Sequence, residues 1–250
     1  SARRPAWSGS RTVRDRRRGR LRQVKAQRVS RIGPARVDPP ALLQINGSTR
    51  SARTLQRMIQ PPDPASRERR PAAATNAAFS VLDECHRQTL AAIAKLEAIV
   101  ARLDTGHPDE STRAAAAAVV RHFSTTARQH HEDEERHVFP KLLANADAST
   151  EQNVRRLQQD HLWLEEDWRE LEPHLDAVAR GQSWYDVAFL RDGCDVFAAL
   201  SRDHITLEET FLYPEARART GPVEGEAMGR EMAARRRAAR RAAASGRAQP

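Results

Sequence analysis

Two stretches of the sequence combine histidine, glutamate and proline in one shared frame. Residues 130–140 read HHEDEERHVFP, and residues 204–214 read HITLEETFLYP. In each stretch a histidine is followed at the fourth position by two adjacent glutamates, and an aromatic residue precedes the proline. Because residues four apart share one face of a helix, each stretch places an imidazole and a carboxylate side by side. Both groups are ligands of divalent metal ions, so each stretch predicts part of a metal site.

Histidines also interrupt the apolar stripes of two other predicted helices, at His86 and His161. A single histidine on an apolar face is more often a core residue with one hydrogen bond than a ligand. Four such histidines, two of them paired with a carboxylate, favour a metal instead. The stripes contain no lysine or arginine that could neutralise the buried glutamates, and an unpaired buried carboxylate is costly.

Counting the candidate ligands favours two metal ions. The six candidates are His86, His130, Glu134, His161, His204 and Glu208. Six donors exceed the three or four protein ligands typical of zinc sites, whereas they suit two ions about 3.5–4 Å apart that both glutamates bridge. Two carboxylates leave a pair of divalent ions with excess positive charge, so an oxo or hydroxo bridge is expected as well. A zinc or manganese site with a purely structural role is the alternative.

Four amphipathic helices must position these residues. Apolar residues recur at intervals of three and four through residues 79–103, 120–142, 154–175 and 187–211. Candidate boundaries lie at Gly106, Asp147, Gly181 and Ser183. The short connections predict an all-α fold, an up-down-up-down antiparallel four-helix bundle over residues 75–220.

The charged residues divide the chain into three blocks. Residues 1–74 contain 19 basic and 4 acidic residues, residues 75–220 contain 16 and 26, and residues 221–250 contain 7 and 3. High charge and low hydrophobicity predict that residues 1–74 are a disordered basic extension. Since Met58 is the first methionine, residues 1–57 could be absent from the native protein or could act as a transit peptide. Residues 221–250 form an Arg/Ala-rich tail without an apolar face and are expected to be unfolded as well.

The basic ends do not by themselves indicate a nucleic-acid partner. Arginine runs can bind nucleic acid, but no nucleic-acid-binding motif accompanies them, so solvated ends are favoured. The sequence has no run of about 18 apolar residues that would span a membrane and no signal-peptide core. Its two cysteines, Cys85 and Cys194, form no disulfide framework. We therefore expect a soluble cytoplasmic protein, and the sequence points to no particular protein partner.

The doubled histidine–glutamate motif, with one histidine on each remaining helix, resembles the haemerythrin-like (HHE cation-binding) domain family. The resemblance covers about residues 76–218. Ferritin-type sites differ, because they space glutamate and histidine three apart and use more carboxylates. The resemblance implies a non-haem di-iron centre, with two iron ions at the six candidate ligands. Such a centre would bind or respond to dioxygen, and in some members to nitric oxide or iron supply.

The third helix departs from the oxygen-carrying haemerythrins. Those proteins have a second histidine one turn after the first, where this chain has Glu165. Glu165 is either an additional ligand or a solvated residue of the acidic run at residues 165–167. Fewer imidazoles would stabilise the ferric state, which argues against reversible oxygen carriage but not against metal binding.

The residues beside the two motifs raise a second difference. The last carboxylate of the oxygen carriers is an aspartate five residues after its histidine, whereas here Glu208 is at the fourth position and Glu209 at the fifth. Glu209 points about 100° away around the helix and is expected to matter little. Beside the other motif, His131 is expected at the surface, and His137 behind the ligands or at the rim of the site.

Two classes of function remain open. The favoured one is a module that binds or senses dioxygen or nitric oxide, or that buffers iron. The alternative is an enzyme in which the same centre reduces peroxide or repairs oxidised iron centres. The sequence shows no obvious substrate pocket, nucleophile or proton donor near the ligands, which favours binding over catalysis.

Overall fold

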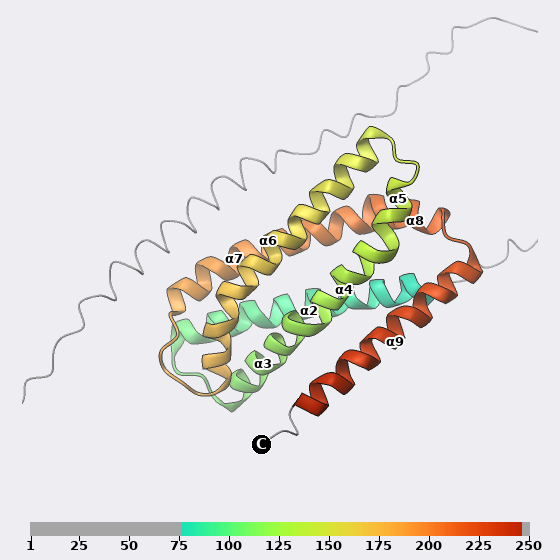
Figure 1. Ribbon diagram of the computed structural model, residues 1–250. Coiled ribbons are helices and arrows are strands. Elements are labelled where there is room, and N and C mark those ends of the chain that lie inside the picture. The colour runs from blue at the N-terminus through green and yellow to red at the C-terminus, as the bar shows by residue number, and fades with distance from the viewer. Residues whose placement is uncertain (1–76, 247–250) are drawn as a thin grey trace, which may run out of the picture. The chain divides into compact units, whose positions relative to one another are not determined.

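The computed structural model describes residues 77–246, and all of its described elements are helices (Figure 1). The all-α class is therefore confirmed for this part of the chain. The predicted basic extension, residues 1–74 with Met58, lies outside the described residues. None of the described helices combines the length and the apolar composition that a membrane crossing requires.

Five long helical segments form the described part, one more than predicted. Three of them are single helices, namely α2 (Ala77–Thr105), α6 (Ala148–Ala179) and α9 (Pro222–Gly246). The second segment consists of α3 (Glu110–Arg121), η3 (His122–Ala127), α4 (Arg128–Asp133), η4 (Glu134–Val138) and α5 (Phe139–Leu143). The fourth segment consists of α7 (Val187–Leu207), η5 (Glu208–Leu212) and α8 (Tyr213–Ala218), and each η element is a π-helical turn.

Local sequence signals explain where the helices begin and end. Asp109, Asp147 and Asp186 each accept a hydrogen bond from the backbone N–H three residues later, at 2.7–3.0 Å, and so cap α3, α6 and α7. Gly181 follows α6 in the left-handed region, with φ of 68°, as expected for a residue that ends a helix. The fourth segment begins at Asp186 rather than at the predicted cap Ser183.

Each copy of the histidine–glutamate motif contains a π-helical turn that ends two residues before its proline. Pro140 and Pro214 lack the N–H that would bond the carbonyl four residues earlier, so the regular ladder is interrupted there. The turns η4 and η5 begin at Glu134 and Glu208, respectively. Such turns are frequent at functional sites, because they redirect side chains within a helix.

Four segments pack around a shared interior. The second segment contacts α2 and α6, and α7 contacts α6 and α2, so the contacts form a closed ring. The buried apolar residues form two clusters, one containing Ile93 and Phe197 and the other containing Leu82 and Leu157. Along each segment, buried polar residues separate the two clusters. This arrangement is a helical bundle, while its up-down-up-down order stays a prediction.

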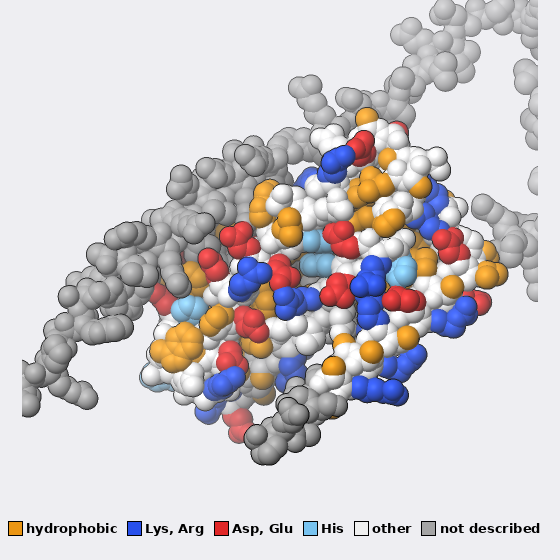
Figure 2. Space-filling model, viewed as in Figure 1, with side chains coloured by type: hydrophobic (Ala, Val, Ile, Leu, Met, Phe, Trp, Pro, Cys, Tyr) orange, Lys and Arg blue, Asp and Glu red, His pale blue; other side chains and the backbone are white. Residues whose placement is uncertain are grey.

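The C-terminal residues contradict the prediction of an unfolded tail. Helix α9 packs against α2, and its Met228 and Met232 are only 6% and 1% exposed, within the cluster that contains Leu82. The arginine- and alanine-rich residues 235–244 have no apolar face, but two methionines one turn apart precede them and supply one. Arginine side chains lie along the outer edge of α9, between exposed alanines (Figure 2). The prediction is therefore wrong for Pro222–Gly246.

Candidate metal centre

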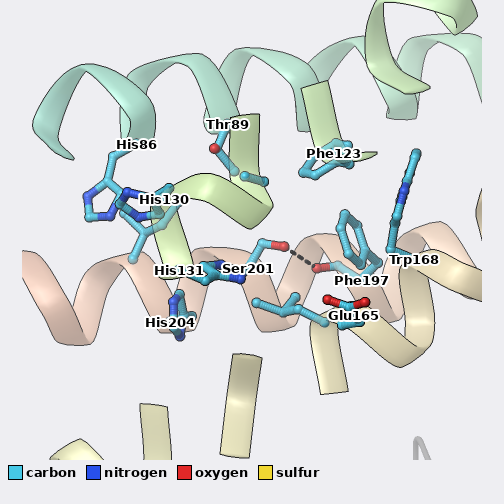
Figure 3. A pocket seen from close by; sticks show the side chains of 13 residues that line it. His86, Thr89, Phe123, His130, His131, Glu165, Trp168, Phe197, Ser201 and His204 are labelled. Atoms are coloured by element: carbon cyan, nitrogen blue, oxygen red, sulfur yellow. Dashed lines mark hydrogen bonds between the residues drawn. The ribbon is translucent and has the colours of Figure 1, made fainter. Parts of the chain in front are cut away.

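A layer of buried histidine and glutamate side chains lies between the two apolar clusters. All six predicted ligands belong to this layer and are between 0% and 7% exposed: His86, His130, Glu134, His161, His204 and Glu208. They come from all four segments of the ring. Figure 3 shows His86 extending from α2 toward α7, beside His130.

The six side chains form two groups that share both glutamates. In the first group, His86 and His130 lie with Glu134 and Glu208. In the second group, the two glutamates lie with His161 and His204. Within each group, one donor atom from every residue lies within 4.8 Å of the others. We refer to the first group as the α2 site and to the second as the α6 site.

Glu208 faces both sites at once. Its Oε2 lies 3.0 Å from Nε2 of His86 in the α2 site, and its Oε1 lies 3.1 Å from Nε2 of His204 in the α6 site. A carboxylate whose two oxygens face imidazoles of different groups has the placement of a bridging ligand between two metal ions.

Glu134 lies between the sites in a different way. Its Oε2 lies 3.5 Å from Nε2 of His130 and 3.4 Å from Nε2 of His161. Its Oε1 accepts a hydrogen bond of 2.5 Å from the hydroxyl of Tyr213. Tyr213 is 1% exposed, and its ring stacks on His86 at a centroid distance of 5.1 Å. The sequence indicated Tyr213 only as the aromatic residue of the motif, not as a hydrogen-bond donor to a ligand.

Many of these buried polar atoms have close neighbours but no hydrogen-bond partner. They are both ring nitrogens of His130 and of His204, Nε2 of His161, Oε2 of Glu134 and both carboxylate oxygens of Glu208. Each unsatisfied buried group costs about 1–3 kcal/mol, and native proteins contain few of them. Imidazole nitrogen and carboxylate oxygen are suitable ligands for iron and for other divalent ions. The donor set therefore fits two metal ions.

Without a metal ion, the buried groups of this layer have pKa values that are shifted in different directions. Burial raises the pKa of Glu134 to about 7, and the charge of Glu208 adds to the rise. Burial lowers the pKa of His204, but the Glu208 carboxylate outweighs this effect, and the pKa is raised to about 10. Burial also holds the pKa of His130 well below its usual range, and the nearby His86 adds to that effect. Metal binding must therefore displace protons from Glu134 and His204, and the raised pKa values of His86 and His161 add to this release.

The second glutamate of each Glu-Glu pair contacts the imidazole of a candidate ligand. Oε1 of Glu209 lies 3.0 Å from Nδ1 of His86, and Oε1 of Glu135 lies 3.1 Å from Nδ1 of His161. Carboxylates in this position orient a ligand histidine and raise its basicity. The prediction that Glu209 points away from the site is wrong, because it reaches α2 rather than a neighbour on its own helix. The repeated Glu-Glu pair was the sequence signal for this role.

The structure does not bring Glu165 into either site. Its carboxylate contacts the guanidinium of Arg128 and lies 3.4 Å from Nη2 of Arg169. The hydrogen bond from Arg128 lowers the pKa of Glu165 and so keeps the carboxylate charged. The carboxylate of Glu165, one of the possible ligands in the sequence, therefore pairs with two arginines instead.

The two histidines that flank the second-segment motif have different surroundings. His131 is half-buried, and its ring stacks on His161 with a centroid distance of 4.0 Å and an interplanar angle of 14°. The prediction of a surface position is therefore wrong for His131. Nε2 of His137 lies 2.7 Å from Oε2 of Glu231 on α9, so His137 connects the bundle with the fifth segment.

A small apolar cavity adjoins the histidine layer. Its volume is about 40 Å³, and His86, His130, His131 and His204 are among the residues that line it. Phe123, Leu164, Trp168, Phe197 and Ile205 form much of its apolar wall. Figure 3 shows the histidines on one side of this space and the aromatic side chains on the other. A cavity of this size holds a few water-sized molecules and excludes a larger substrate.

The fold and the donor set together define a cation-binding helical bundle. The family model described as Hemerythrin HHE cation binding domain matches residues 77–243. Since this match covers more than half of the sequence, the chain belongs to the hemerythrin HHE cation-binding domain family. The matched residues extend through most of α9. The chain has no match among curated proteins.

Proposed function

We propose that the protein is a non-haem di-iron protein that binds or senses dioxygen or nitric oxide. One iron would occupy the α2 site and the other the α6 site, with Glu134 and Glu208 as bridging ligands. The observation that carries this proposal is the placement of Glu208, whose two oxygens lie 3.0 and 3.1 Å from imidazoles of different sites. Membership of a cation-binding family supports a metal at these residues.

The residues around the centre would prepare it for a small ligand. Bound iron would supply redox chemistry and open coordination positions. Glu209 and Glu135 orient one imidazole of each site, and Tyr213 holds Glu134 through its hydroxyl. The apolar cavity disfavours water, which needs several hydrogen-bond partners, and admits an uncharged diatomic molecule. These features favour dioxygen or nitric oxide over a charged or bulky substrate.

One observation favours a second candidate, an enzyme that reduces peroxide. The hydroxyl of Tyr213 lies 3.2 Å from Nε2 of His86, and burial raises the pKa of Tyr213 well above its usual range. The hydroxyl therefore stays protonated and lies at the centre as a hydrogen-bond donor, although its raised pKa makes it a weak proton donor. Two observations weigh against catalysis. Burial raises the pKa of the neighbouring Cys85 to about 12, so this thiol is not a ready nucleophile. The small cavity also favours small molecules over a bulky substrate.

Iron loading followed by ligand addition tests these functions. The protein would be loaded anaerobically with ferrous iron, analysed for metal, and exposed separately to air, nitric oxide, azide and peroxide. We expect about two irons per chain, near-ultraviolet absorption after exposure to air, and a new visible band with azide. Tight binding of a single colourless zinc would exclude the di-iron centre. Repeated peroxide turnover that the substitution Tyr213→Phe abolishes would identify the enzyme instead.

A further inference from the structure

We propose that His131 is a seventh metal ligand, which gives the α6 site a third imidazole beside His161 and His204. This inference rests on the proposed di-iron function and adds a donor to one of its two sites. The additional ligand would then come from the second helical segment and not from Glu165 on α6, for which the sequence left open both a ligand and a solvated position.

The three imidazoles form a compact group. One ring nitrogen from each of His131, His161 and His204 lies within 4.8 Å of the other two, as in the groups that contain the glutamates. The ring of His131 stacks on His161 and meets the ring of His204 at a centroid distance of 5.5 Å and an angle of 72°. The lone pairs of the two stacked rings lie in nearly parallel planes, so joint binding of one ion at about 2.1 Å requires the ring of His131 to rotate out of the stack.

Hydrogen bonding does not account for two members of this group, His161 and His204. Both ring nitrogens of His204 and Nε2 of His161 are buried without a hydrogen-bond partner. The other nitrogen of His161 is engaged by Glu135 at 3.1 Å, on the side away from the glutamates that are shared by both sites. A metal ion is the one partner to which all three imidazoles could donate a lone pair.

His130 and His131 are adjacent in the sequence, so one helix can supply a ligand to each of the two sites. His130 and His131 differ by about 100° around the helix axis. His130 therefore joins the α2 site, while His131 lies against His161 on α6. Both rings are labelled at the histidine side of the cavity in Figure 3. The α6 site would then have three imidazoles and the α2 site two, so the two ions should differ in affinity and in spectroscopic signature.

A pair of histidine variants tests this inference in the full chain. His131→Ala removes the proposed ligand, and His122→Ala is its matched control. His122 lies on the same helical segment, is also half-buried, and bonds the cavity residue Thr89 at 2.9 Å, but it belongs to none of the donor groups found among the described residues. Each protein would be titrated anaerobically with ferrous iron and examined by metal analysis and ⁵⁷Fe Mössbauer spectroscopy. Circular dichroism would check the metal-free fold.

We expect His131→Ala to weaken binding of one ion by more than about 100-fold, beyond the roughly 10–100-fold effect of residues that only orient a ligand. One Mössbauer doublet should change and the other should persist, whereas His122→Ala should leave both doublets unchanged. If His131→Ala does not fold, His131→Gln keeps the size of the side chain and should show the same loss. A folded variant with a smaller loss or with unchanged doublets would overturn the inference.

The unsubstituted protein reports separately on the proposed function. If it binds only one iron, the di-iron centre is wrong. The effect of His131→Ala on that single ion would still decide whether His131 is a ligand.

Discussion

The guanidinium of Arg236 on α9 lies 2.5 Å from Oδ2 of Asp133, a fully buried carboxylate one residue before Glu134. Arg235 contacts the other oxygen of the same carboxylate. A helix outside the ring of four segments thus neutralises a charge beside the proposed metal ligands. Without α9, Asp133 would lose both of these partners while remaining within the second segment.

Removing both arginines should destabilise the fold. The double variant Arg235→Ala/Arg236→Ala should lower the free energy of unfolding by about 3–5 kcal/mol, because it leaves a buried carboxylate without these cations. Urea denaturation of the metal-free protein measures the change, with Arg230→Ala on the exposed side of α9 as the control. Adding Asp133→Asn should restore part of the loss. A double variant as stable as the control would show that α9 does not act through Asp133.

Glu208→Ala should reduce bound iron to one per chain or less, because the substitution removes an oxygen donor from both sites. The metal-free bundle should persist, since the substitution also removes a buried charge that is unfavourable without metal. Metal analysis and circular dichroism measure the two effects. Glu215→Ala changes an exposed glutamate on α8 and should leave iron binding intact. Two tightly bound irons in Glu208→Ala would exclude its bridging role.

Glu209→Ala should weaken one ion by roughly 10–100-fold without abolishing binding, because it releases Nδ1 of His86. This outcome differs from the small effect expected from helical spacing. Glu135→Ala should have the equivalent effect on the other ion through His161. Ferrous titration with Mössbauer detection can assign each loss to a site. Unchanged affinity in Glu209→Ala would mean that the 3.0 Å contact does not orient His86.

The metal-free protein should lose stability as the pH rises from about 7 to about 10. The pKa of His204 is raised from 6.5 to about 10, despite burial, because of Glu208. The folded state therefore keeps a proton that the unfolded chain releases above pH 6.5, and this stability is lost as the pH rises through the folded pKa. The lowered pKa of His130 acts in the opposite direction, but only below its ordinary value of 6.5.

Thermal unfolding at several pH values measures this dependence. Iron should remove most of it, since the metal replaces the proton on His204. His204→Gln should flatten the profile of the metal-free protein in the same range. A metal-free protein whose stability does not change between pH 7 and 10 would contradict the assignment.

Helical spacing was sufficient to predict the four segments of the ring and the six inward donors. The direction of a side chain relative to its own helix axis depends only on its position along that helix. His130 with Glu134, and His204 with Glu208, could therefore be placed on one face before any tertiary contact was known. The capping preferences of aspartate and glycine placed the ends of α6 at Asp147 and Gly181.

Contacts between different helices could not be obtained in this way. They depend on how each helix is rotated about its axis and on which distant residue lies opposite. Glu209 points away from Glu208 on its own helix, yet its carboxylate contacts His86 on α2. Glu165 forms an ion pair with Arg128 on another segment. His131 required the position of α6 before its stacking on His161 was apparent.

Helix α9 was not predicted from the sequence, for a related reason. Its apolar face consists largely of Met228 and Met232, which are too few to signal an amphipathic helix within an arginine-rich segment. Its ion pairs to Asp133 join residues about a hundred positions apart, as the pairing of Arg236 with Asp133 shows. The carboxylate of Asp133 and the two methionines of α9 are buried favourably only when both helices are in place. This burial is therefore a property of the packed bundle and not of either segment alone.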